Sequence, residues 1–172
     1  MRRFTTLATA VLCLALLPAG AVLAAETMKL TDMHICCGGC TKGILKAVEG
    51  LTAVKVTVDQ DAEEATIVAD DKAAGIKALK AIAAAGYHAS IDGKTIDMEN
   101  APAGKVTRLT VSNAHNCCGA CTTAIRNAIK TVAGVEADTC KPKQPEFVIE
   151  GNFEAKAVVE ALAKAGFHVS VK

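Results

Sequence analysis

The chain has 172 residues, a formal net charge of +1 and 3% aromatic residues. Its basic residues form no stripe, so nucleic-acid binding lacks both its electrostatic footprint and its stacking side chains. This length accommodates one average domain or two small ones.

The first 24 residues have the pattern of a secretory signal peptide. Arg2 and Arg3 give a positive start, an apolar run follows from Leu7 to Leu17, and small residues lead to Ala24. The apolar run is shorter than the roughly 20 residues of a membrane-spanning helix. We expect cleavage after Ala24 and a periplasmic or secreted protein with no membrane span; an uncleaved anchor is the alternative. Removing Arg2 and Arg3 from the 19 basic residues leaves 17 against 18 acidic ones, a net charge of −1.

Between residues 26 and 91 the hydrophobic pattern switches between strand alternation and helical spacing. Cys40, Ile44 and Val48 form one helical stripe, and Asp71 can cap a second helix that Gly86 ends. The stripe of that second helix is expected at Ile76, Leu79 and Ile82. In chain order the pattern predicts a strand over 26–35, a helix over 39–49, strands over 54–59 and 64–70, a helix from 72 to about 85, and a strand over 87–91.

The second half of the chain repeats the first. An offset of 81 residues places "MHICCGGC" on "AHNCCGAC", and an offset of 80 later places "AGYHASI" on "AGFHVSV". The histidine pairs are therefore repeat-equivalent: His34 with His115 and His88 with His168. Each unit has the order βαββαβ, which predicts an α+β fold of two tandem ferredoxin-like sandwiches. The predicted segments are a signal peptide at 1–24, a first domain at 25–92, a linker at 93–104 and a second domain at 105–172.

Right-handed crossovers predict a sheet order of four-one-three-two in each unit. This order brings the start of the last strand to the cysteine end of the first. We therefore expect His88 beside His34 and His168 beside His115. Alternation places Tyr87 in the core and His88 on the open face. The hairpin that carries Cys140 is expected at the same end but on the far edge.

Seven cysteines remain after signal cleavage, and six of them lie in two tight clusters. A disulfide within one cluster would close a very short loop and constrain nothing distant, so metal binding or redox chemistry explains the clusters better. A C-x-x-C pair at a helix start suits a soft metal ion, because the helix N-terminus favours thiolates. Cys36 is either a third thiolate or packing, and His34 either completes a Cys3His set or hydrogen-bonds the loop. The candidate ligands are Cys36, Cys37, Cys40, His34, Cys117, Cys118, Cys121 and His115.

Each unit resembles the heavy-metal-associated domain family, which includes copper chaperones, the N-terminal domains of heavy-metal P-type ATPases and periplasmic mercury-binding proteins. The C-x-x-C pairs and the "AGY" and "AGF" strings carry the resemblance, which covers nearly the whole mature chain. It implies a ferredoxin-like fold, Cu(I) as the first choice of metal, and a metal transporter or another metal-binding domain as partner. The family loop usually reads Gly-Met-x-Cys-x-x-Cys. Here His34 and Ile35 replace the glycine and methionine, and the added Cys36 raises Zn(II), cadmium or mercury as alternatives.

The sequence thus predicts an exported binder of soft heavy-metal ions rather than an enzyme, with about two ions per chain if each loop is one site. Carrier and buffer roles both stay open. A periplasmic thiol–disulfide oxidoreductase is the alternative from another class. Against it, the strand order is not that of thioredoxin, and no proline is suited to the usual cis position beside such a site.

Overall fold

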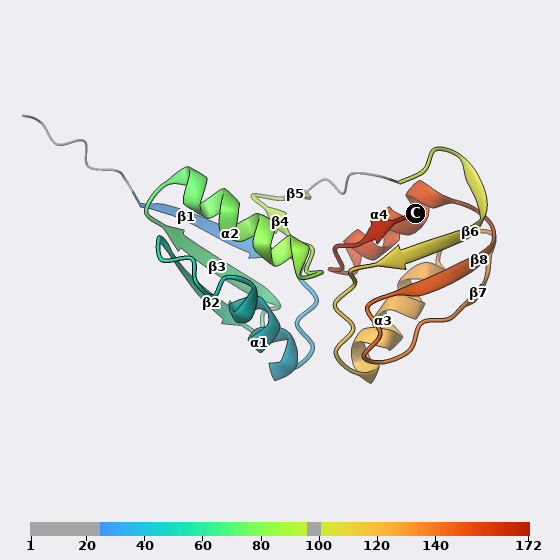
Figure 1. The fold of residues 1–172 in the computed structure, drawn as a ribbon, viewed down its shortest axis with the longest axis horizontal. Coiled ribbons are helices and arrows are strands. Elements are labelled where there is room, and N and C mark those ends of the chain that lie inside the picture. The colour runs from blue at the N-terminus through green and yellow to red at the C-terminus, as the bar shows by residue number, and fades with distance from the viewer. Residues whose placement is uncertain (1–24, 96–100) are drawn as a thin grey trace, which may run out of the picture.

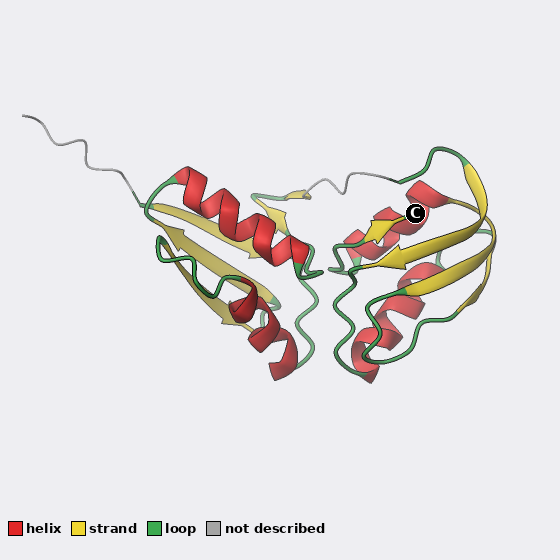
Figure 2. Cartoon of the chain, viewed as in Figure 1, coloured by secondary structure: helices red, strands yellow, loops and turns green. Residues whose placement is uncertain are grey.

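The computed structural model describes residues 25–95, the first unit, and residues 101–172, the second unit. The predicted signal peptide lies outside the described residues. Each unit is an antiparallel sheet covered on one face by two helices, and the two units lie side by side (Figures 1 and 2). The predicted α+β fold of two ferredoxin-like sandwiches is confirmed. Within the described ranges, no helix combines the length and apolar character needed to cross a membrane.

The first unit has the predicted strand order with one added strand, β2-β3-β1-β4-β5. The added β5 forms a hairpin with β4 inside the segment predicted as linker. In chain order the elements are β1 (Glu26–Thr31), α1 (Gly38–Ala47), β2 (Val54–Asp59), β3 (Glu64–Ala69), α2 (Lys72–Ala84), β4 (Ser90–Ile91) and β5 (Lys94–Thr95).

The second unit repeats this order as β7-β8-β6-β9. Its hairpin differs from that of the first unit, because β7 is short and a loop over residues 139–146 precedes β8. In chain order the elements are β6 (Lys105–Ser112), α3 (Gly119–Lys130), β7 (Val135–Asp138), β8 (Phe147–Glu154), α4 (Ala155–Lys164) and β9 (Ser170–Val171).

Helix α2 begins as predicted but packs through a different face. The Asp71 side chain accepts a hydrogen bond of 2.8 Å from the Ala74 backbone N–H and so caps the helix. The predicted inward residue Ile76 is 37% exposed, which makes that part of the stripe wrong. Small residues face the sheet instead: a side chain at Gly75 would lie 2.7 Å from the Met28 methyl group. Helix α2 therefore approaches β1 more closely than a stripe of large side chains would allow.

The last strand of each unit is shorter than predicted. Strand β4 covers Ser90–Ile91 rather than the whole of 87–91. The residues before it pair with the other unit instead, through an antiparallel bridge between Tyr87 and Phe167. The repeat-equivalent ends of α2 and α4 thus meet where the two units join (Figure 1).

Candidate metal site

The contact between the units, which we call the seam, consists of Gly86–His88 and Gly166–His168 together with the cysteine loops. Two backbone hydrogen bonds cross it. The His88 N–H donates to the Gly166 carbonyl and the His168 N–H donates to the Gly86 carbonyl, each at 3.0 Å. Because the same two bonds run in both directions, the seam relates the repeats by an approximate two-fold axis.

Glycine is required on both sides of this seam. Gly86 and Gly166 have φ values of +90° and +81°, which side-chain-bearing residues rarely adopt. A Cβ at Gly86 would also meet the backbone of Asn113 and His115, and one at Gly166 would meet the backbone of His34. Each glycine ends a helix in its own unit and admits the cysteine loop of the other unit.

The seam brings the two cysteine loops together. Cys37 and Cys118 are the N-cap residues of α1 and α3, whose first turns lie close to each other in Figure 1. The six sulfurs of the two loops, which we call the six-sulfur cluster, are in contact across the units. The measured Sγ–Sγ distances are 3.7 Å for Cys36–Cys40, 3.7 Å for Cys36–Cys118, 3.5 Å for Cys36–Cys121, 3.8 Å for Cys37–Cys117, 3.6 Å for Cys40–Cys117, 3.6 Å for Cys117–Cys121 and 3.9 Å for Cys118–Cys121.

The six-sulfur cluster has the connectivity of an octahedron. Pairs without a short contact still share groups whose ligand atoms lie within 4.8 Å of one another, such as Cys36 with Cys37 and Cys40 with Cys121. Seven pairs with a short contact and five pairs that share such a group make twelve neighbouring pairs, the number of edges of an octahedron. The three remaining pairs take the places of opposite corners: Cys36 and Cys117, Cys37 and Cys121, and Cys40 and Cys118. Every opposite pair joins one unit to the other.

The thiols of the cluster differ in acidity. The backbone N–H groups of Cys40 and Gly39 hold the pKa of Cys37 below its ordinary value, although the sulfur makes no capping hydrogen bond. The backbone of Cys121 does the same for the pKa of Cys118. Burial instead raises the pKa of Cys36.

Burial likewise raises the pKa of Cys117, the counterpart of Cys36. At the buried base of the cluster, the neighbouring thiol of Cys40 lowers the pKa of Cys121 to about 6, while the neighbouring Cys121 raises the pKa of Cys40. The site thus favours thiolates at the two helix starts.

His34 and His115 lie on the inner side of the cluster, with ring centroids 5.7 Å apart. The His115 Nδ1 is 2.7 Å from the Gly86 carbonyl, which can only accept, so Nδ1 carries the proton and Nε2 keeps its lone pair. That Nε2 is buried and has no hydrogen-bond partner among the described residues, and the same holds for the Nε2 of His34. A ring nitrogen freed in this way is the usual arrangement of a metal-binding histidine.

Each of these histidines joins cysteines from both units. His34 groups with Cys36 and Cys121, whereas His115 groups with Cys40 and Cys121. The sequence left open whether His34 completes a Cys3His set within its own loop, and the grouping places it with one cysteine from each unit. Burial lowers the pKa of His34, which keeps its ring neutral and able to bind a metal.

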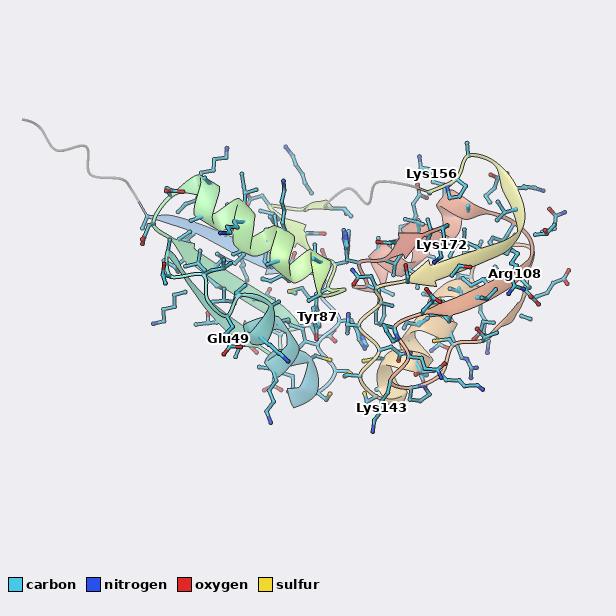
Figure 3. All side chains as sticks on the ribbon, viewed as in Figure 1. Glu49, Tyr87, Arg108, Lys143, Lys156 and Lys172 are labelled. Carbon is cyan, nitrogen blue, oxygen red and sulfur yellow. The ribbon has the colours of Figure 1, made fainter. Side chains whose placement is uncertain are left out.

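His88 and His168 do not lie where the topology predicted. The prediction that His88 faces an open surface is wrong, because its side chain is 1% exposed. Its ring stacks on His168, with centroids 5.8 Å apart, so each partners the late histidine of the other unit rather than the early histidine of its own. The places beside His34 and His115 are taken by Phe167 at 4.7 Å and Tyr87 at 4.0 Å. Tyr87 is buried as expected, but at the seam between the units (Figure 3).

Asn116 supports the second loop in a way that sequence reasoning missed. Its Nδ2 donates to the Lys141 and Gln144 carbonyls at 2.7 and 3.0 Å, and its Oδ1 accepts from Thr122 at 2.8 Å. The same Nδ2 lies 3.5 Å from the sulfur of Cys140, which is fully buried with its pKa raised by burial to about 11. Cys140 therefore lies beneath the loop, outside the six-sulfur cluster.

The structure thus gathers all eight predicted ligand residues at one place, although sequence reasoning assigned them to two. Sequence reasoning did not give Tyr87, Phe167, Gly86 and Gly166 a part in joining the units. The available signal was the recurrence of "AGYH" and "AGFH" together with the cysteine strings, which marked both segments as features of the same repeat.

Comparison with known proteins gives a distant structural similarity. No protein-family model matches the chain, and no characterised protein matches its sequence. The chain is similar to the solution structure of the N-terminal soluble domains of Bacillus subtilis CopA, with a TM-score of 0.34 and 16% sequence identity. The match covers 87% of this chain and 95% of that one.

Proposed function

We propose that this protein is an exported binder of soft heavy-metal ions, with Cu(I) as its cargo, and that both units contribute to one site. The observation that carries the proposal is the six-sulfur cluster, in which sulfurs of the two units lie as close as 3.5 Å. Thiolates and neutral histidine nitrogens select Cu(I), zinc and their heavier relatives over hard cations.

The connectivity of the sulfurs favours Cu(I) over zinc bound by four thiolates. A metal–thiolate bond of about 2.3 Å separates two sulfurs by about 4.6 Å across a linear ion, by about 4.0 Å along the edge of a trigonal ion and by about 3.8 Å along the edge of a tetrahedral ion. The measured 3.5–3.9 Å is too short for a linear ion and is near both other values, so the number of mutually neighbouring sulfurs is what separates the two metals. Tetrahedral zinc bound by four thiolates needs four sulfurs that are all mutual neighbours, and any four corners of an octahedron include an opposite pair.

Metal competition on the reduced protein tests this proposal. We expect Cu(I) to be held against a Cu(I)-selective chelator, and zinc, cadmium and mercury to be bound as alternatives with Cu(I) preferred over zinc. Oxidation to disulfides should abolish binding, because a disulfide offers no thiolate. A reduced protein that holds no metal but exchanges disulfides at enzyme-like rates would favour the oxidoreductase alternative.

Export is a separate part of the proposal, supported by the signal-peptide pattern of residues 1–24. N-terminal sequencing of the protein from periplasmic or secreted fractions should give a mature chain that starts at Ala25. A full-length chain confined to the cytoplasm would contradict export without affecting metal binding. A delivery partner would be a metal transporter or another metal-binding domain, and a buffer would need none.

A further inference from the structure

We propose that the six-sulfur cluster holds four Cu(I) ions as one polynuclear centre, with every thiolate bridging two ions. This inference rests on the proposed function, because it specifies how the same site holds its Cu(I). It replaces the two independent ions expected if each C-x-x-C loop were its own site.

The argument starts from the octahedron. A trigonal ion needs three mutually neighbouring sulfurs, and the faces of an octahedron are such triples; Cys36, Cys37 and Cys118 form one, with all ligand atoms within 4.8 Å. Four alternate faces of an octahedron meet only at corners, so four ions fit without sharing an edge. Every corner then belongs to two filled faces, and no sulfur is left with a single bond to metal.

The short contacts agree with this arrangement. Cys121 lies 3.6 Å from Cys117 and 3.9 Å from Cys118, and these three residues form a second face, which meets the first face only at Cys118. These edges are near the about 4.0 Å of a trigonal site with metal–sulfur bonds of about 2.3 Å. They are well short of the about 4.6 Å that a linear ion between two sulfurs would impose.

Charge also permits four ions. Four Cu(I) ions and six neutral thiols have a total charge of +4 before binding. Binding gives a cluster of charge −2 and releases six protons, so the total charge is again +4. Two separate Cu(I) ions, each held by two thiolates, would leave the same −2. The starts of α1 and α3, capped by Cys37 and Cys118, each place about half a positive charge beside the cluster.

The test is Cu(I) titration of the purified reduced protein without oxygen, followed by native mass spectrometry and copper X-ray absorption. We expect a single chain that carries four copper ions to dominate at saturation, together with a copper–copper scattering shell. Saturation at one or two ions per chain without that shell, or four ions only in a species of two chains, would overturn the cluster and leave the proposed function standing. Absence of any bound Cu(I) would overturn both.

Two variants sharpen the test. Cys36→Ser removes a corner shared by two filled faces, so bound copper should fall from four ions to two or fewer, and Cys117→Ser should do the same. If the C-x-x-C pairs were separate sites, neither variant would lose an ion. The control is Cys140→Ser, which removes a cysteine outside the cluster and should keep four ions; circular dichroism checks that all three variants fold. Retention of four ions by Cys36→Ser would overturn the proposal.

Discussion

At the scale of single residues, the site works by giving chemically identical thiols different environments. Cys37 and Cys118 are N-caps that face backbone N–H groups, whereas burial raises the pKa of Cys36 and of Cys117. All four side chains are half-buried, so exposure does not distinguish them. A metal ion that arrives at the loops therefore meets thiolates at the helix starts first.

The first prediction concerns these thiols. At pH 7 in the metal-free reduced protein, a small alkylating reagent should modify Cys37 and Cys118 faster than Cys36 and Cys117. A lowered pKa raises the thiolate fraction at neutral pH, and the thiolate is the nucleophile. Mass mapping of a time course measures this order. Equal rates at all four positions would mean that the helix starts do not differentiate the thiols.

A second prediction concerns how Tyr87 reaches the seam. A side chain at Gly43 would meet the Tyr87 hydroxyl group, with the ring carbon that bears it 3.2 Å away, whereas the repeat-equivalent residues of the second unit are Ala124 and the hydroxyl-free Phe167. Gly43→Ala should therefore overpack α1, at a cost of about 1–3 kcal/mol. Tyr87→Phe removes the hydroxyl group that causes this clash. In the Tyr87→Phe background, Gly43→Ala should therefore stabilise the helix by about 0.5–1 kcal/mol.

Urea unfolding of the wild-type protein, both single variants and the double variant measures this coupling. The effect of Gly43→Ala should change sign when position 87 is Phe. An effect of the same sign and size in both backgrounds would show that Gly43 does not make room for the Tyr87 hydroxyl.

At the scale of elements, the sequence predicted what local pattern controls and missed what the neighbouring unit controls. Strand order, the Asp71 cap and the helix that ends at Gly86 follow from periodicity and capping within one unit. The length of β4 does not, because Tyr87 and His88 pair with the other unit. Ile76 was misplaced because small residues such as Gly75 let α2 approach β1, and periodicity of large apolar residues cannot show this.

A third prediction tests the turn that follows α2. Gly86→Ala should separate the units and weaken Cu(I) binding, because the new methyl group meets the backbone of Asn113 and His115. Gly50→Ala is the matched control: its φ of +86° is almost the +90° of Gly86, but no atom of residues 25–95 or 101–172 outside its own chain neighbours lies within 4 Å of the added carbon. Both variants carry the same backbone strain, so only the clash differs.

Small-angle scattering of both variants, with Cu(I) affinity measured alongside, checks this prediction. The radius of gyration should rise for Gly86→Ala and stay at the wild-type value for Gly50→Ala. Equal behaviour of the two variants would show that backbone strain at the glycine, rather than docking of the second loop, accounts for the effect of Gly86→Ala.

At the scale of the whole molecule, two units that fold from local pattern become one site through the seam. The sequence pattern does not show that the two units dock, because the pattern of a repeat is the same whether its copies stay apart or dock. The paired histidines His88 and His168 lie in that seam, and no residue in the described part of the chain hydrogen-bonds the ring nitrogens of His88. The closed arrangement therefore depends on both rings being neutral.

A fourth prediction follows from this dependence. Burial, with His168 beside it, lowers the pKa of His88 to about 4, and burial lowers the pKa of His168; Asp32 acts in the opposite direction on His88. A form in which the two units have separated exposes both histidines, so it binds more protons than the docked form between about pH 6.5 and pH 4. Docking of the units therefore weakens as the pH falls through this window. Scattering of the metal-free reduced protein should show a larger radius of gyration at pH 5 than at pH 7.5. His88→Gln with His168→Gln should remove this difference, and a wild-type radius that is constant across the window would contradict the account.

The central claim is that both loops build one site, and the Cys118→Ser/Cys121→Ser double variant tests it most directly. This variant leaves the whole first loop intact but removes sulfurs that lie 3.7 and 3.5 Å from Cys36. Cu(I) affinity of the first loop, measured by chelator competition, should fall by roughly tenfold or more, which corresponds to about 1.4 kcal/mol of lost binding free energy. A first loop that still binds one Cu(I) ion with the affinity of the wild-type protein would contradict the shared site.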